Sequence, residues 1–142
     1  MTSYREEILK KAVCKYYNVT EKELHSNTRR AEVVGARRMF YYMARKHFDQ
    51  TYKSIGRKFN QDHATVIFHE KKLADFLTFD KNEIRRYIKV RDMVFDEVTF
   101  INIKDEMDTL LRDKLLIDDR LSEIKNELTA ISNQNNFNYY GN

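Results

Sequence analysis

The chain has 142 residues, no proline, three glycines and a formal net charge of +4. This scarcity of helix breakers favours an all-α protein, built as one compact helical domain with an appended element. The single cysteine, Cys14, excludes a disulfide framework and a thiol metal cluster, and no apolar run reaches membrane-spanning length. No segment resembles a signal peptide, so we expect no membrane association and a cytoplasmic location.

The positive charge is concentrated in the middle of the chain. Residues 27–72 hold 11 Lys and Arg against 4 Asp and Glu, whereas residues 99–142 hold 5 against 8. A localised basic segment indicates a polyanionic partner, most often nucleic acid, although a solvated basic surface fits the charge equally well.

Three helices are predicted before residue 51. Apolar residues at helical spacing indicate the first helix over 4–17, and a capping box starts a short second helix over 20–25. A polar connection at 26–32 leads into a long third helix at about 31–48. On that helix, His47 is expected to be a satisfied core histidine, and neither of the first two helices carries chemistry.

Residues 51–77 predict two helices joined by a tight turn. Thr51 can cap the first helix, and Asp62 can cap the second, where the positive end of the helix dipole also favours a carboxylate. His63 and Ala64 are then left at the exposed leading end of the second helix. A helix with a small, polar N-terminus behind a cationic partner helix is typical of a helix-turn-helix that reads the major groove of DNA.

The order I-G-R-K-F followed by D-H-A-T-V-I resembles the C-terminal DNA-binding domain of the bacterial replication initiator DnaA. The residues in register are Ile55, Gly56, Phe59, Asp62, His63, Thr65, Val66 and Ile67. The similarity extends upstream through A-R-R-M at 36–39 and K-Y-Y-N at 15–18, and covers about residues 8–77. It implies that double-stranded DNA is the partner.

The resemblance also implies a set of DNA contacts. Arg29 matches the minor-groove arginine of the family, and Asp62, His63 and Ala64 would face base edges in the major groove, where they can respectively accept, donate and meet a thymine methyl. The positions expected to contact phosphates are Arg30, Arg37, Arg38, Arg45, Thr51, Lys53, Gln61, Thr65, Lys71 and Lys72. Each contact has an alternative without DNA. The loop around Arg29 would be an ordinary solvated loop, the arginines of the third helix would form a solvent-exposed face, and Asp62 would serve only as a helix cap.

Several positions depart from the family pattern. Gln61 stands where the family commonly has Arg, Ala64 replaces a hydroxyl residue, and Lys53 stands where proline is common. Asn60 replaces a pair of glycines, so the turn is one residue shorter, and residues 35–36 replace an Arg-Pro pair. Despite these differences DNA binding remains the leading expectation, and whether the chain recognises the family's own target sequence stays open.

The apolar period changes from Phe100 onward into alternating steps of three and four. This heptad seam comprises Ile103, Met107, Leu110, Lys114, Ile117, Leu121, Ile124 and Leu128, extended by Phe100 and Ile131, with Lys114 at an a position. It predicts a coiled coil that forms a homo-oligomer; a helix folded back on its own domain is the alternative. In a parallel dimer Asp113 would meet Asp118 and Arg120 would meet Lys125, which favours an antiparallel pair or a bundle.

The expected domain organisation is a DNA-binding domain over 1–98, a self-association helix over 99–133 and a flexible tail over 134–142. No phosphate-binding loop, Ser-His-Asp set or metal cluster occurs, so we expect neither an enzyme nor a cofactor. The sequence predicts a sequence-preferring DNA-binding protein for replication-site binding or transcription regulation, of a kind suited to a phage or mobile element. The alternative is a protein-assembly module that has lost DNA contact.

Overall fold

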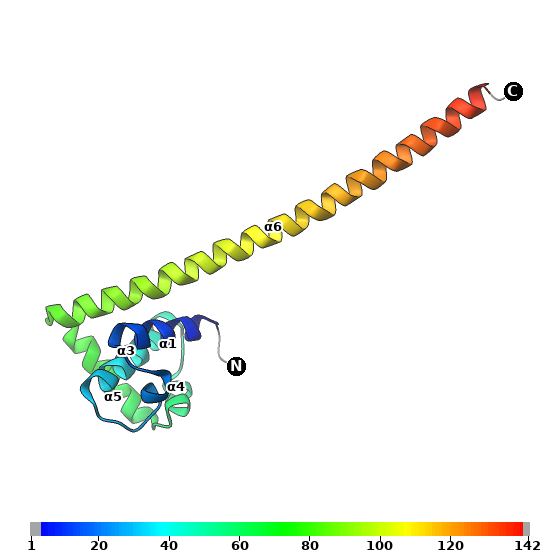
Figure 1. The fold of residues 1–142 in the computed structure, drawn as a ribbon. Coiled ribbons are helices and arrows are strands. Elements are labelled where there is room, and N and C mark those ends of the chain that lie inside the picture. Colours follow the sequence, from blue (N-terminus) through cyan, green and yellow to red (C-terminus); the bar gives the residue numbers. More distant parts are fainter. Residues whose placement is uncertain (1–3, 141–142) are drawn as a thin grey trace. The chain divides into compact units, whose positions relative to one another are not determined.

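The computed structural model describes residues 4–140, with side chains described as far as residue 135. The helices are α1 (Tyr4–Tyr17), α2 (Glu21–Leu24), α3 (Ala31–His47), α4 (Tyr52–Phe59), α5 (His63–Phe76) and α6 (Lys81–Tyr140), in the order shown in Figure 1. No strand occurs between residues 4 and 140. The predicted all-α fold, with a helix-turn-helix and a long C-terminal helix, is confirmed.

The chain divides into an N-terminal unit, Met1–Thr99, and a C-terminal unit, Phe100–Asn142. Helix α6 contributes to both units, because no glycine or proline interrupts it after Lys81. Helix α6 also continues to Tyr140, into the segment for which the sequence predicts a flexible tail. The next residue is Gly141, a helix-breaking residue type, which lies outside the described residues.

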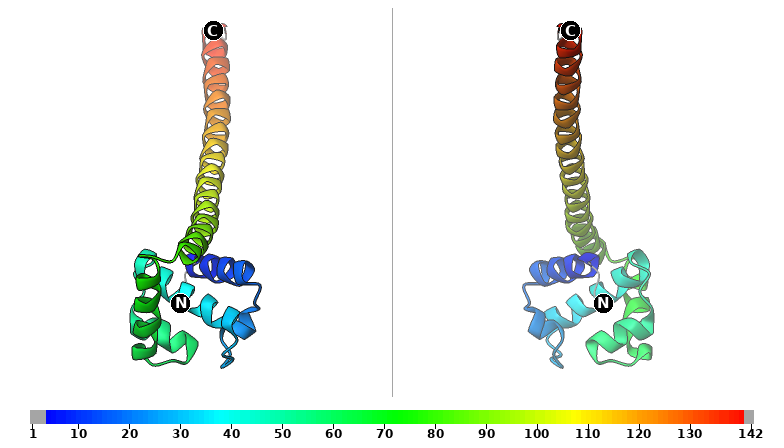
Figure 2. Two further views of the ribbon diagram at one scale, coloured as in Figure 1. Left: turned by 90° about the vertical axis from the view of Figure 1, so that its left-hand side faces the viewer. Right: turned by 90° about the vertical axis from the view of Figure 1, so that its right-hand side faces the viewer.

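Helix α3 forms the centre of the N-terminal unit and contacts α1, α2, α4 and α5; the views in Figure 2 show these helices gathered around it. Met39, Phe40 and Met43 are fully buried on α3. Tyr41 and Tyr42 are buried as well, at 1% and 8% exposure. Helix α3 is thus packed against other helices on most sides. Its arginines therefore do not form a single solvent-exposed face.

The start of α6 closes this core. Tyr87, Val90, Val94 and Val98 are buried against it, and the hydroxyl of Tyr87 lies 2.7 Å from Nε2 of His47. Burial, followed by the charge of Lys46, lowers the pKa of His47. His47 is therefore a satisfied, half-buried histidine, as predicted.

The predicted helix caps are confirmed by their hydrogen bonds. The hydroxyl of Thr20 accepts from N of Glu23 at 3.1 Å, and that of Thr51 accepts from N of Ser54 at 3.0 Å. The same kind of cap also begins α6, where a carboxylate oxygen of Asp80 accepts from N of Glu83 at 3.2 Å. Each bond satisfies a donor that the first turn of a helix leaves without a backbone partner.

An ion pair between a buried carboxylate and a half-buried ammonium ties α1 to α4. Glu6 is 2% exposed, and Nζ of Lys58 lies 2.6 Å from both of its carboxylate oxygens. Gln50, in the connection between α3 and α4, accepts from the same Nζ at 3.0 Å. This network fixes the start of the helix-turn-helix against the first helix of the chain.

None of the described helices has the length and apolar character that crossing a membrane requires.

Candidate DNA interface

The turn between α4 and α5 is built around Gly56. Asn60 adopts the left-handed conformation at φ 52°, and N of Gln61 donates to O of Gly56 at 2.8 Å. A Cβ added to Gly56 would lie 2.5 Å from O of Gln61. Only glycine therefore lets the turn fold back this closely over α4, and the turn in turn sets where α5 begins.

The leading end of α5 carries the residues predicted to face bases. Asp62 caps the helix through a carboxylate oxygen that accepts from N of Thr65 at 2.8 Å. Hydrogen bonds from Thr65 lower the pKa of Asp62. His63 and Ala64 are exposed in the first turn, whereas Thr65 is half-buried. Asp62 thus serves as a cap while its side chain remains accessible to an external group.

The loop before α3 is held in place by one arginine. Arg37 donates from Nε to O of Leu24 and from Nη1 to O of Thr28, both at 2.8 Å, and from Nη2 to O of Ser26. These bonds, and a longer one from Nη2 to O of Glu23 at 3.3 Å, hold one guanidinium against carbonyls of α2 and of the loop that follows it. Arg37, predicted to contact phosphate, is therefore committed to shaping the loop that presents Arg29.

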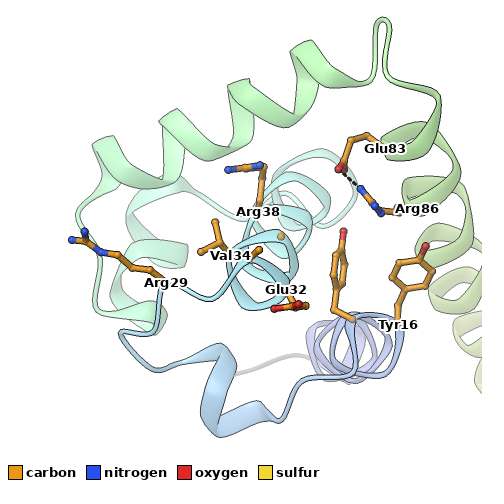
Figure 3. A pocket seen from close by; sticks show the side chains of 10 residues that line it. Tyr16, Arg29, Glu32, Val34, Arg38, Glu83 and Arg86 are labelled. Atoms are coloured by element: carbon orange, nitrogen blue, oxygen red, sulfur yellow. Dashed lines mark hydrogen bonds and ion pairs between the residues drawn. The ribbon is translucent and has the colours of Figure 1, made fainter.

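Arg29 is exposed and borders two clefts. One of about 530 Å³ lies between the loop and the start of α5, and Gln61, Thr65 and His69 also line it. The other, of about 800 Å³, is lined by residues of α1, α3 and the start of α6. In Figure 3 the guanidinium of Arg29 points away from the ion pair between Glu83 and Arg86. The structure thus brings the predicted minor-groove arginine to the same cleft as the beginning of the predicted reading helix.

Arg30 and Arg38, also predicted to contact phosphates, have partners within the protein. Arg30 pairs with Glu23 at 2.7 Å and with Glu32 at 3.5 Å on the surface. Nε of Arg38 donates to Nδ1 of His69 at 3.4 Å. Exposed pairs of this kind contribute little to stability and exchange readily, so Arg30 remains available to a phosphate.

Arg45 has a structural position between α3 and α4. Its Nη1 donates to O of Gln50 at 2.9 Å, and its guanidinium carbon lies 4.1 Å from the centre of the Tyr52 ring. Its Nε is buried and has no hydrogen-bond partner among the described residues. Arg45 therefore braces the connection that leads into α4.

The other predicted phosphate contacts are accessible. Thr51, Lys53, Lys71 and Lys72 are exposed, and Gln61 is half-buried. Because Lys53 lies on α4 while Lys71 and Lys72 lie on α5, the exposed lysines come from both helices of the helix-turn-helix.

One exposed aromatic residue on α5 was missed by the sequence reasoning. Phe68 is 58% exposed, and Nζ of Lys72 lies 5.5 Å from the centre of its ring. The signal was available, since Phe68 falls outside the apolar stripe that includes Val66 and Leu73. The loop-holding role of Arg37 had no such signal, because it depends on carbonyls from another segment.

No group of side chains among the described residues could hold a metal ion.

Comparison with known proteins matches this part of the chain to one family. The model of the bacterial DnaA protein helix-turn-helix matches residues 6–73. The chromosomal replication initiator protein DnaA of Desulfatibacillum aliphaticivorans is 42% identical over 60 residues, which cover 42% of this chain and 13% of that protein. DnaA of Bacteroides thetaiotaomicron is 36% identical over 73 residues, covering 51% of this chain and 16% of that protein.

A longer match is less similar. DnaA of Caldanaerobacter subterraneus is 28% identical over 87 residues, covering 61% of this chain and 20% of that protein. This chain therefore spans no more than about a fifth of the length of these relatives. The resemblance to the helix-turn-helix domain of bacterial DnaA is thereby confirmed, and it is carried by residues 6–73 of this chain.

Proposed function

We propose that the N-terminal unit binds double-stranded DNA with a sequence preference, inserting the start of α5 into the major groove and Arg29 into the adjacent minor groove. The observation that carries the proposal is the shared cleft: Arg29 borders it from the loop, and Gln61 and Thr65 border it from the beginning of α5. His63 and Ala64, which lie between Gln61 and Thr65 in the sequence, are exposed. Base readout needs small and polar side chains that water can reach in the free protein.

The proposed base contacts are Arg29, Asp62, His63 and Ala64. The carboxylate of Asp62 can accept from a cytosine amine with the lone pairs that its cap bond leaves free. His63 can donate to a base-edge acceptor, and Ala64 can contact a thymine methyl. Arg29 suits a narrow A·T-rich minor groove, where the potential is most negative.

The proposed phosphate contacts differ in how directly they act. Lys53, Lys71 and Lys72 are exposed and supply positive charge from both helices of the motif. The remaining candidates for phosphate contacts are Thr51, Gln61, Thr65, Arg30 and Arg38. Arg37 and Arg45 are proposed to act indirectly, by holding the loop and the start of α4, because their donors are used within the protein.

The test is a fluorescence-anisotropy titration with an initiator-box duplex and a shuffled duplex, repeated over a range of salt concentrations. We expect His63→Ala to reduce the ratio of the two affinities about tenfold, since one base contact is lost. Lys71→Ala should weaken binding to both duplexes alike and reduce the salt slope by about one. Equal losses of sequence preference in the two variants would contradict this division of roles, and no binding at low salt would refute DNA binding itself.

The cellular role that we propose is occupation of a replication site or control of transcription in the cytoplasm, without nucleotide hydrolysis. Its support is that the family model that matches this chain, at residues 6–73, is that of the helix-turn-helix domain of the initiator. A phosphate-release assay with ATP, in the presence and absence of the bound duplex, tests the last point. Sustained turnover above a protein-free blank would refute it.

Self-association through the C-terminal unit is the second part of the proposal, and it also supports the alternative of an assembly module. The supporting observation is that Phe100, Ile103, Leu110 and Leu128 are each at least 60% exposed on one helix. Light scattering coupled to size exclusion measures the mass with and without a duplex. A mass of two or more copies that added DNA never increases would favour the assembly module.

A further inference from the structure

The C-terminal unit carries an apolar seam whose described side chains are exposed or half-buried. No side chain described between residues 100 and 135 is buried, and Met107, Ile117 and Leu121 are 52%, 59% and 48% exposed. Most helical stability in proteins comes from packing an apolar face, so a lone helix with this pattern is marginal in water. The seam requires a partner that presents a matching seam.

The charges beside the seam disfavour a parallel, in-register pair. Phe100, Met107, Lys114 and Leu121 occupy a positions, so the g positions include Asp113 and Arg120. In a parallel, in-register pair each g residue faces the e residue five positions later on the other chain. That arrangement sets Asp113 against Asp118 and Arg120 against Lys125, and it forms no pair of opposite charge.

An antiparallel pair with the same seam has the opposite charge pattern. In that geometry a residues face d residues, g faces g and e faces e. When Lys114 lies opposite Leu110 of the partner subunit, Glu106 faces Arg120 of the partner subunit and Lys104 faces Asp118 of the partner subunit. The two-fold symmetry of a homodimer forms each of these attractions twice.

The same register accounts for one apolar residue outside the seam. Leu111 is 56% exposed at an e position, and the two-fold axis brings it against Leu111 of the partner subunit. Asp113 meets its own copy on the other side of the axis, which is the single like-charged contact. Shifting the pair by one heptad, so that Lys114 faces Ile117 of the partner subunit, would oppose Glu106 to Glu127 and Lys104 to Lys125 and would pair Asp113 with Arg120. The two-fold symmetry then gives four repulsions against two attractions.

The ion pairs seen within the helix do not compete strongly with this arrangement. Arg120 lies 2.9 Å from Glu123, and Lys114 lies 4.0 Å from Asp118, in each case between exposed side chains. Such surface pairs contribute little and are exchanged at low cost. Lys114 can reach solvent and its own Asp118 from the edge of the seam, because its long stem covers apolar surface while its charge stays in water.

We propose that residues 100–124 form a two-stranded antiparallel coiled coil with a second copy of this chain, in the register that brings Leu111 against Leu111 of the partner subunit. The two copies of Phe100 then lie at opposite ends of the coil, about 36 Å apart along its axis. The two N-terminal units therefore leave the coil at opposite ends. Resting on the proposed DNA binding, this arrangement makes the dimer a bridge between two separate duplexes.

Pulsed electron paramagnetic resonance tests the orientation without involving DNA. Single spin labels are placed on the outer face of the helix at Arg112→Cys and, separately, Asn126→Cys, both in full-length protein carrying Cys14→Ser. The antiparallel register sets the label at 112 level with its own copy and displaces the label at 126 by about 42 Å along the axis. We expect the distance between labels to be longer at 126 than at 112 by more than about 20 Å.

Equal distances at the two positions would overturn the proposal in favour of a parallel coil. A monomer in light scattering, or an assembly of three or more copies, would also overturn it. Far-ultraviolet circular dichroism of each labelled variant confirms that the chain is folded before the distances are compared.

Charge reversal tests the register itself. Glu106→Arg should raise the dimer dissociation constant about tenfold, since two attractions become repulsions. Combining it with Arg120→Glu should restore affinity to within about threefold of the unmodified protein. The matched control is Asp119→Arg, an equal change of charge on the outer face, which should leave the dissociation constant unchanged. A combined variant weaker than Glu106→Arg alone would contradict the register.

Capture of a second duplex tests bridging. Beads carrying one duplex are loaded with protein, and a fluorescent duplex of the same sequence is added; unmodified protein should retain it, whereas Glu106→Arg at low concentration should retain at least fivefold less. Protein that fails to stay on the beads would refute the DNA binding on which bridging rests. Protein that stays on the beads as a dimer but never retains the second duplex would refute bridging alone.

Discussion

The two units differ in where their apolar residues go. In the N-terminal unit Phe40, Ile55 and Val66 are fully buried within one chain, so a single copy completes its own core. In the C-terminal unit, Leu110 and Leu128 are each 60% exposed, and no side chain described between 100 and 135 is buried. The comparison teaches that one continuous helix, α6, can bury its apolar residues at one end and leave them exposed at the other, and it is the exposed end for which we propose a second copy.

Removal of the C-terminal unit is expected to have the largest effect, because it separates the unit with a buried core from the unit with exposed apolar residues. Truncation after Thr99 keeps Val94 and Val98 in the core, so we expect the remaining protein to fold with an unchanged α-helical domain. Self-association should be lost completely, and light scattering should report a monomer. A truncated protein that still dimerises would place the self-association surface in the N-terminal unit.

The next largest effect is expected at Gly56. Its substitution by alanine drives a Cβ to 2.5 Å from O of Gln61, a backbone atom, so the turn must open. We expect Gly56→Ala to lower the free energy of unfolding by about 3 kcal/mol and to weaken DNA binding, because the start of α5 moves. Urea denaturation followed by circular dichroism measures the first quantity.

Gly35→Ala is the matched control for that substitution. A Cβ there would lie 3.1 Å from a ring carbon of Tyr17, which can shift, and alanine favours the helix interior by about 1 kcal/mol. The net change in stability should therefore be close to zero. A loss at Gly35 as large as that at Gly56 would show that the turn contact is not the cause.

The helices were predictable because their signals are local. The caps at Thr51 and Asp62 depend on neighbours three residues away, and α1 and α3 occupy the predicted ranges to within one residue. The exposure of His63 followed from the same reasoning, since the apolar stripe of α5 points the other way.

The contacts that hold the candidate interface could not be predicted from local pattern. Arg37 bonds to carbonyls as far as 14 residues away in sequence, and Lys58 pairs with Glu6 across 52 residues. A cationic side chain near a DNA-binding motif looks the same in sequence whether it contacts a phosphate or supports the loop. Only the three-dimensional arrangement separates Arg37 and Arg45 from the exposed lysines.

The pair between Glu6 and Lys58 gives a smaller, local test of the N-terminal unit. Glu6→Ala leaves the ammonium of Lys58 without its carboxylate in a half-buried position, so we expect about 2 kcal/mol of lost stability, less than for a fully buried pair. Glu7→Ala, which removes only an exposed partner of Lys10, should cost less than about 1 kcal/mol. Chemical denaturation of the two variants under the same conditions makes the comparison, and equal losses would contradict the role of burial.

The smallest expected effect is a dependence of the N-terminal unit on pH. Burial, then the charges of Arg38 and Lys72, lowers the pKa of His69 below its usual value of 6.5. Such a histidine binds a proton more readily when the chain is unfolded, so its contribution is complete above about pH 6.5 and is lost as the pH falls.

We therefore expect the free energy of unfolding to be lower at pH 5.5 than at pH 7.5, in the full chain and in the chain truncated after Thr99 alike. His69→Asn, which keeps an acceptor for Arg38 but does not titrate, should reduce this difference without removing it, because the pKa values of His25 and His47 are lowered by burial as well. Greater stability at pH 5.5 would reverse the sign of the argument. A pH dependence found only in the full chain would move its origin to the C-terminal unit, which has no histidine.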